Sequence, residues 1–255
     1  MKRLSLLISL LLILILGSCH NHASKNKLII ATSANMQFAI KPIIKAFSGQ
    51  TGISCHSIIG SSGKLTAQIN RGAPYNVFVS ADMKYPEEIY RHGLSLSKPV
   101  AYAAGKLVLW SDEKQIPPDF QSLINKKIKF IAIANPKTAP YGRAAKEVLQ
   151  SKKLWKRLKP KMVFGESIAQ VNQFILSHAA NIGFTAKSVV LSPGMKHRGK
   201  WSSIPDSLYS PIFQGVVVIK QSPEIDKKAM EFYRFLFSQK AKDILQQYGF
   251  QTERL

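Results

Sequence analysis

Short apolar runs alternate with amphipathic segments along most of the chain. The runs are flanked by small polar residues and are rich in β-branched side chains, which predicts buried strands at 27–31, 53–59, 77–79, 130–134, 162–164, 181–185 and 216–219. Between them apolar residues recur with helical spacing, as at Phe38, Ile40, Ile43, Ile44 and Phe47. This alternation predicts an α/β fold with largely parallel sheets.

Three longer segments complete this picture. Residues 100–110 are extended and apolar, and together with 216–219 they are predicted to form two crossings between lobes. Residues 192–205 are polar and are predicted to be a loop. The pattern over 223–248 predicts one helix, which Gly249 closes.

The stretch 57–82 has the clearest local pattern: strand, tight loop, helix, turn and strand. Its loop is Gly60-Ser61-Ser62-Gly63, small enough for the backbone to come close to a ligand. Hydroxyls and free N–H groups at a helix start suit an oxyanion. The same residues are equally typical of an ordinary helix N-cap.

A strand, a small polar loop and a helix start recur at three other junctions, at Ala34-Asn35, Pro140-Tyr141 and Ser167-Ile168. In open α/β sheets, ligands bind outside the carboxyl ends of strands, where helix N-termini point. Most such loops bind nothing, so each junction alone is weak evidence. If the junctions converge, they predict a site rich in N–H and O–H donors.

The N-terminus predicts export. Residues 1–18 have the basic start and apolar run of a secretory signal, and the run 4–16 is short for a membrane span. Leu16-Gly17-Ser18-Cys19 resembles the cleavage box of bacterial lipoproteins, which predicts a lipidated Cys19, although plain cleavage near Ser18 is the alternative. Residues 19–26 then form a tether. A lipidated Cys19 leaves Cys55 as a packed free thiol.

Composition restricts the possible partners. The chain has 255 residues, 45% of them hydrophobic, which is ample for one large domain or two lobes. Its formal net charge of +22 raises the hypothesis of a nucleic-acid or polyanion-binding surface protein. The bases are spread along the chain, and the densest group, at 152–161, has one aromatic residue and no stacking ladder. A solvated basic face without nucleic acid is therefore favoured.

Enzymatic and metal-binding motifs are incomplete. Ser61-x-x-Lys64 matches the Ser-x-x-Lys of penicillin-binding enzymes, but their Ser-Asp-Asn and Lys-Thr-Gly elements are missing. Residues 60–64 are too short for a phosphate-binding P-loop. The six histidines show no metal-ligand spacing except His20-x-His22, which lies in the tether. The sequence predicts no enzyme and no bound metal cation.

Several segments together resemble the periplasmic molybdate-binding proteins of ABC importers, over nearly all of 27–250. These segments are Ala34-Asn35, Gly60-Ser-Ser-Gly-Lys-Leu-Thr-Ala-Gln-Ile, Gly72-Ala-Pro, Val79-Ser-Ala-Asp82, Gly165-Glu-Ser-Ile-Ala-Gln-Val-Asn-Gln-Phe174, Ile182-Gly-Phe-Thr-Ala-Lys-Ser188 and Ile244-Leu-Gln-Gln-Tyr-Gly-Phe250. The resemblance implies a two-lobed periplasmic-binding-protein fold of type II, in which each lobe is a mostly parallel sheet flanked by helices. It implies lobe 1 at 27–103 plus 213–255 and lobe 2 at 104–212.

The resemblance also implies a site and its partners. By motif position the oxyanion donors fall on Asn35, Ser62, Tyr141 and the backbone N–H of Ile168, with Ala34 beside them. Some family members have a tyrosine where this chain has Ala186. The implied function is capture of molybdate, or tungstate, without a cofactor and delivery to an ABC transporter permease, by a periplasmic protein anchored to the membrane through lipid. The alternatives are another small oxyanion such as sulfate, or the polyanion-binding surface protein.

Overall fold

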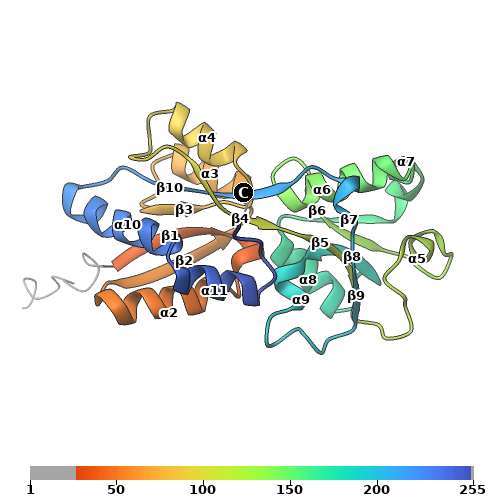
Figure 1. The fold of residues 1–255 in the computed structure, drawn as a ribbon. Helices are drawn as coiled ribbons and strands as arrows, with labels where there is room; N and C mark the ends of the chain where they lie inside the picture. Colours follow the sequence, from red (N-terminus) through yellow and green to blue (C-terminus); the bar gives the residue numbers. More distant parts are fainter. Residues whose placement is uncertain (1–26, 254–255) are drawn as a thin grey trace, which may run out of the picture.

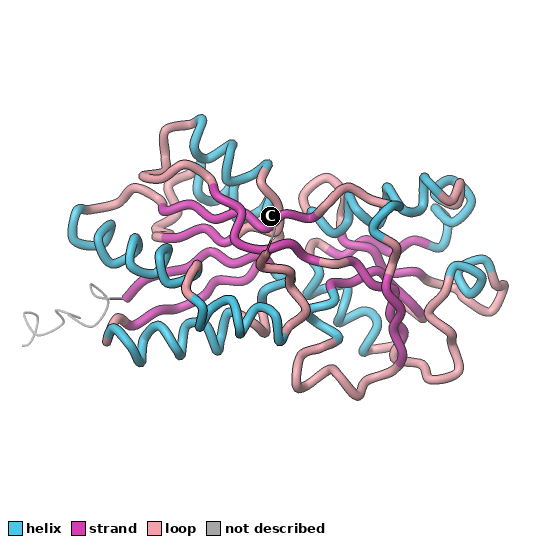
Figure 2. The backbone as a smooth tube through the Cα atoms, viewed as in Figure 1, coloured by secondary structure: helices cyan, strands magenta, loops and turns pink. Residues whose placement is uncertain are grey.

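The computed structural model describes residues 27–253 of the chain. These residues form two lobes that lie side by side, each with a five-stranded sheet (Figure 1). Tracing the tube in Figure 2 shows strands inside each lobe and helices around them. The predicted signal at 1–18, tether at 19–26 and lipidation at Cys19 lie outside the described residues.

The sheet of lobe 1 has the strand order β2-β1-β3-β10-β4. Its strands are β1 (Lys27–Ser33), β2 (Ser54–Gly60), β3 (Val77–Val79), β4 (Val100–Gly105) and β10 (Ile212–Val218). β2 and β3 pair parallel with β1, whereas β10 pairs antiparallel with both β3 and β4. Four strands therefore run one way and only β10 runs the other way.

Helices cover both faces of this sheet. One face holds α2 (Ile40–Thr51), α10 (Pro223–Leu236) and α11 (Gln239–Gln247), and the other holds α3 (Ser62–Asn70) and α4 (Lys84–Arg91) (Figure 1). Phe47 of α2 is fully buried and packs edge-on against Phe232 of α10, with ring centroids 5.1 Å apart. The apolar spacing of 38–47 thus marks the buried face of α2, which a short 3-10 turn, η2 (Ala34–Met36), precedes.

Lobe 2 repeats this topology with the order β7-β6-β8-β5-β9. Its strands are β5 (Leu107–Ser111), β6 (Ile131–Ala134), β7 (Met162–Gly165), β8 (Ile182–Ala186) and β9 (Lys200–Ser203). Its helical segments are α5 (Phe120–Ile124), α6 (Pro140–Ser151), α7 (Trp155–Leu158), η3 (Lys159–Lys161), α8 (Ile168–Leu176), α9 (Lys187–Val190) and η4 (Asp206–Leu208). Here β5 is the strand that runs against the other four.

The chain crosses between the lobes twice within the described residues. Lys106 alone separates β4 from β5, and the residues after η4 lead back into β10. The crossings are tied together, because Lys106 forms an ion pair with Asp206 and the Leu107 N–H donates to the Tyr209 hydroxyl at 3.2 Å. The lobe limits at 103/104 and 212/213 stay a prediction.

The fold class predicted from the alternation is confirmed, but two local predictions were wrong. Residues 223–248 are two helices, because Ser238 adopts an extended conformation and its side chain accepts a hydrogen bond from the Ala241 N–H as an N-cap. The polar stretch 192–205 contains β9, an edge strand paired with β5. The residues of β9 are at least partly exposed and show no apolar pattern. The strand forms through its hydrogen bonds to β5 and not through burial of apolar side chains.

Replacement of Ser238 by alanine tests the helix break. Ser238→Ala removes the cap of α11 and should lower the free energy of unfolding by about 1 kcal/mol in urea denaturation. Ser222→Ala is the matched control, because Ser222 also occupies an N-cap position, before α10, but makes no side-chain cap bond. Equal losses in the two variants would contradict the assigned role of Ser238.

Candidate functional site

Four helical N-termini from the two lobes meet at one small cavity. Lobe 1 contributes η2 and α3, which follow β1 and β2, and lobe 2 contributes α6 and α8, which follow β6 and β7. The cavity is lined by Ser33, Ala34, Asn35, Ser61, Ser62, Ala81, Ala139, Pro140, Tyr141 and Ile168. The structure therefore brings together all five residues that the sequence placed in a site. Whether they hold a ligand stays a prediction.

The walls of this cavity are uncharged. None of its lining residues carries an ionisable acid or base other than the Tyr141 phenol. The first turns of α3, α6 and α8 instead offer backbone N–H groups that have no partner within the helix. Pro140 has no N–H, so Tyr141 carries the first backbone donor of α6. Such helix starts favour a negative charge.

A pair of serines adds a hydroxyl donor. The Ser33 and Ser62 hydroxyl oxygens lie 2.6 Å apart, and the Ala81 N–H donates to both at 3.0 Å. The two hydroxyl groups carry two protons, and one of these protons forms the hydrogen bond between them. One O–H proton therefore remains for a group in the cavity. The sequence did not predict Ser33, whose only signal is its position at the end of β1, directly before Ala34.

Asn35 is buried and held on two sides. Its backbone carbonyl accepts from the Ser188 hydroxyl of lobe 2 at 2.7 Å, and its side-chain Nδ2 donates to Gln214 Oε1 of β10 at 2.7 Å. Gln214 is completely buried. Sequence analysis missed both Ser188 and Gln214, because each contacts Asn35 only through the tertiary fold.

Tyr141 is almost fully buried, and its ring reaches from α6 toward lobe 1. A Cβ atom placed on Gly105 would lie 2.0 Å from the Tyr141 hydroxyl, so this glycine makes room for the ring. Burial raises the pKa of this hydroxyl far above its usual range. The hydroxyl has no hydrogen-bond partner among the described residues. Tyr141 thus brings two separate donors to this region, its backbone N–H and its hydroxyl.

Polar contacts join the lobes around the cavity. The Gly63 N–H donates to the Thr138 carbonyl at 2.9 Å, and the Tyr85 hydroxyl donates to the Lys137 carbonyl at 3.3 Å. Arg143 of lobe 2 forms an ion pair with Asp82 of lobe 1. Burial raises the pKa of the Asp82 carboxyl, and the Arg143 guanidinium opposes this shift. The structure therefore has the two lobes in contact over the cavity.

Comparison with known proteins decides the family. The model of the family described as bacterial extracellular solute-binding protein matches residues 28–251. The chain belongs to this family.

Individual relatives of the family resemble the chain over most of its length. The molybdate-binding protein ModA of Rhodobacter capsulatus is 37% identical over 91% of this chain and 90% of its own length. The solved structure of the periplasmic molybdate-binding protein of Azotobacter vinelandii superposes with a TM-score of 0.82 at 35% identity, covering 88% of this chain and 98% of that one. A Bacillus subtilis protein described as an ABC transporter substrate-binding lipoprotein, YvgL, is 28% identical over 99% of both chains.

The Ser61-x-x-Lys64 spacing does not create a catalytic pair in this solute-binding protein. The Ser61 hydroxyl accepts from the Lys64 backbone N–H at 3.4 Å, as a helix cap. The Lys64 ammonium lies 2.7 Å from Glu166 of lobe 2, and both side chains are half exposed. The lysine is thus directed across the cleft between the lobes.

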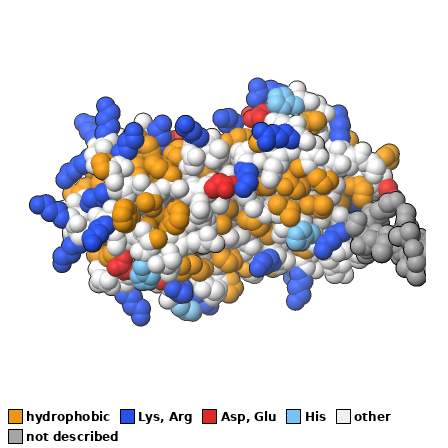
Figure 3. Space-filling model, turned by 180° about the vertical axis from the view of Figure 1, so that it is seen from behind, with side chains coloured by type: hydrophobic (Ala, Val, Ile, Leu, Met, Phe, Trp, Pro, Cys, Tyr) orange, Lys and Arg blue, Asp and Glu red, His pale blue; other side chains and the backbone are white. Residues whose placement is uncertain are grey.

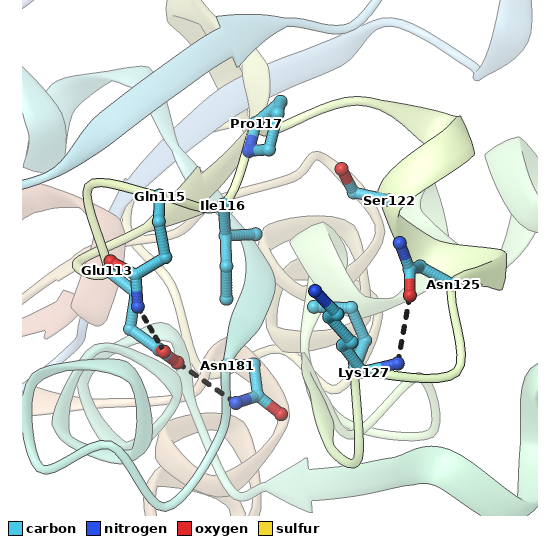
Figure 4. A pocket seen from close by; sticks show the side chains of 9 residues that line it. Glu113, Gln115, Ile116, Pro117, Ser122, Asn125, Lys127 and Asn181 are labelled. Carbon is cyan, nitrogen blue, oxygen red and sulfur yellow. Dashed lines mark hydrogen bonds between the residues drawn. The ribbon is translucent and has the colours of Figure 1, made fainter.

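A larger cavity, of about 380 Å³, lies elsewhere in lobe 2 (Figure 4). Its polar side chains bond to one another: Glu113 accepts from both Gln115 and Asn181, and Asn125 accepts from the Lys127 N–H. It shares no residue with the cavity at the helix N-termini. Across 27–253 no group of histidine, cysteine, aspartate or glutamate could hold a metal ion, and no helix there is long and apolar enough to span a membrane.

Substitution of Gly63 tests whether the lobes close as the structure shows. A Cβ atom at Gly63 would lie 2.6 Å from the Tyr85 hydroxyl of its own lobe and 2.9 Å from the Thr138 carbonyl oxygen, which lies across the cleft in lobe 2. Gly63→Ala should therefore force the lobes apart and increase the radius of gyration in small-angle X-ray scattering.

Gly49→Ala is the matched control for this experiment. A Cβ atom at Gly49 meets nothing within 4 Å, and the position lies inside α2. This variant should keep the wild-type radius of gyration and gain about 0.5–1 kcal/mol of stability. A Gly63→Ala profile identical to that of the wild type would mean that the lobes do not touch there in solution.

Proposed function

We propose that this chain is an extracytoplasmic solute-binding protein that captures molybdate, or tungstate, between its two lobes and delivers it to an ABC transporter permease. The observation that carries this proposal is the uncharged cavity at the helix N-termini, in a chain whose relatives include molybdate-binding proteins.

Neutral donors can hold a dianion if there are enough of them. Burial of an ion without a partner is costly, whereas several charge-assisted hydrogen bonds offset that cost. We assign these bonds to the free hydroxyl proton of the Ser33–Ser62 pair and to the backbone N–H groups of Asn35, Tyr141 and Ile168. Ala34 lines the cavity but has no side-chain donor.

Size is the property left to distinguish similar oxyanions. Sulfate and molybdate have the same shape and charge, so the same donors suit both. The smaller sulfate can reach fewer of the fixed donors at once than molybdate. We therefore expect selection through cavity dimensions, with closure of the lobes completing the site.

Calorimetric titration of residues 24–255 with molybdate, tungstate and sulfate tests the proposal. We expect molybdate and tungstate to bind at one ion per chain and sulfate to give no heat of binding. Binding of sulfate alone would favour the alternative oxyanion function. If none of the three ions gave a heat of binding, the transport assignment would be overturned.

Two serine variants, one in the cavity and one outside it, provide a matched pair. Ser62→Ala removes the hydroxyl that faces Ser33 and should weaken molybdate binding roughly tenfold to a hundredfold, as expected for a hydrogen bond to a charged group. Ser238→Ala removes the cap of α11, whose residues do not line the cavity, and should lower stability by about 1 kcal/mol with little change in affinity. Unchanged affinity of Ser62→Ala would remove this hydroxyl from the site.

Salt dependence separates oxyanion capture from binding of a polyanion. Lys and Arg side chains are distributed over both lobes on the face shown in Figure 3. Binding in a neutral cavity should respond mildly to salt, whereas binding of a polyanion to these bases should collapse as salt rises.

We further propose that the protein is exported and anchored through a lipid on Cys19, as the segment 16–19 predicts and as the description of YvgL supports. Cys19→Ser should then move the protein from the membrane fraction to the soluble fraction after cell lysis. A Ser24→Ala variant, altered in the adjoining sequence, should stay with the membrane. Retention of Cys19→Ser at the membrane would exclude a lipid anchor at this position.

A further inference from the structure

A group of six cations in lobe 2 has no acidic partner in the described part of the chain. The six are Lys152, Lys153, Lys156, Arg157, Lys159 and Lys161, on or beside α7 and η3, and no aspartate or glutamate occurs between Glu147 and Glu166. None of the six forms an ion pair within residues 27–253. Repulsion among like charges disfavours this arrangement, and an anionic partner would relieve it.

A hollow of about 340 Å³ lies among these cations and is lined by Gln150, Lys153, Trp155 and Lys156. These side chains offer two ammonium groups, an indole N–H and an amide NH₂, none of which has a hydrogen-bond or ion-pair partner within 27–253. The larger cavity of lobe 2 is different, because its polar side chains bond to one another. Free donors without a nearby carboxylate in the lining suit an anionic group such as phosphate.

Aromatic rings adjoin these donors. The partly exposed Trp155 pairs with Phe164 at a centroid distance of 6.3 Å, and Phe164 is 45% exposed. The Lys146 ammonium lies 5.7 Å from the centre of the Trp155 ring. Tryptophan and phenylalanine among lysines are typical of surfaces that meet a membrane interface. A dissolved phosphate gains nothing from exposed rings, and a single ring pair is no stacking ladder for nucleic acid.

Lys153 occupies a backbone position that usually belongs to glycine. Its φ is 56°, and its N–H donates to the Gln150 carbonyl at 2.9 Å where α6 ends. The left-handed conformation is costly for residues other than glycine. Four other helices have a glycine of positive φ at or just after their ends, namely Gly52, Gly72, Gly93 and Gly249. The backbone therefore disfavours a lysine at 153, which points to a role for its side chain.

We propose that the α7 surface, formed by Gln150, Lys153, Trp155, Lys156 and Phe164, binds the phosphate groups of anionic phospholipids and holds lobe 2 against the membrane. In Figure 1, α7 lies at the outer end of lobe 2, whereas β1 begins at the outer end of lobe 1. The proposed lipid anchor would attach the end of the molecule where β1 begins. Two attachments hold a protein at a membrane more strongly than one, and together they would orient the cleft. The inference rests on the proposed export and anchoring, not on oxyanion capture.

Cosedimentation of residues 24–255 with vesicles tests the α7 surface without the anchor, since this segment contains both sheets complete. We expect binding to vesicles of phosphatidylglycerol and phosphatidylcholine, and none to phosphatidylcholine alone. Lys153→Gln combined with Lys156→Gln should weaken binding about 25-fold, because one basic residue near an anionic surface contributes about fivefold. Lys41→Gln combined with Lys45→Gln is the matched control, since it removes two exposed lysines from α2 of lobe 1. This control should change binding less than about twofold.

Lys153→Gly separates the charge from the fold. Glycine relieves the cost of positive φ, so the folding equilibrium constant from urea denaturation should rise about fivefold, while vesicle binding should fall about fivefold. His178→Gly is the matched control, because His178 has a φ of 58° just after α8. It should gain stability in the same way and leave vesicle binding unchanged.

Fluorescence quenching reports whether the rings meet the bilayer. Lipids with brominated acyl chains should quench the wild-type protein, and Trp155→Phe should abolish this quenching. Trp110 is fully buried and should not be quenched.

Three results would overturn the α7 surface. An equal loss of binding in the α2 control would assign vesicle binding to net charge alone. Calorimetric binding of inorganic phosphate at Lys153 and Lys156, without vesicle binding, would make the hollow a site for a dissolved anion. Binding of single-stranded RNA without vesicle binding would assign it to nucleic acid. Because none of these assays uses molybdate, failure here and failure of the proposed oxyanion capture are distinguishable.

Discussion

An anion that is buried without a counter-charge has to be surrounded by oriented donors, and the convergence of four helix starts on one cavity meets that constraint for the proposed ion. A single helix start offers only a few N–H groups, which point along one axis. Donors around a tetrahedral ion have to come from several directions. Two lobes with the same topology solve this, because each sends two strand–loop–helix junctions to one cavity.

Both polar and apolar contacts hold the lobes together, since Ala34 and Ala81 of lobe 1 also pack against the core of lobe 2. The ion pair between Lys64 and Glu166 is half exposed and contributes little, about 0–1 kcal/mol. Less exposed contacts lie beside the cavity: Gly63 with Thr138, Asn35 with Ser188, Tyr85 with Lys137 and Arg143 with Asp82. The contacts that close the lobes thus lie beside the proposed donors, so occupancy of the site and closure favour each other.

Local sequence patterns predicted the fold class and the four strand–loop–helix junctions, because both depend on short-range signals, and the resemblance to molybdate-binding proteins singled out the five cavity residues at these junctions. A small polar loop between an apolar run and a helical pattern is visible at Ser62, Tyr141 and Ile168 without any knowledge of the tertiary fold. Gln214 and Ser188 gave no such signal. Gln214 is separated from Asn35 by 179 positions, and nothing in its own segment distinguishes it from any polar residue in a strand. The break at Ser238 was missed for a related reason, since an apolar face continues on both sides of it and conceals the cap.

The cavity is neutral, whereas the chain carries a formal net charge of +22. The surface charge and the cavity therefore affect different steps of binding. A positive field raises the rate at which anions arrive and is screened by salt beyond about 10 Å. The rate of release depends on short-range hydrogen bonds and on the hinge, which salt screens much less. For the proposed oxyanion, surface charge thus acts on association, while the serine pair and the helix N-termini act on dissociation. A buried lysine in the cavity would strengthen binding of any anion alike, so its absence from the lining residues leaves selectivity to geometry.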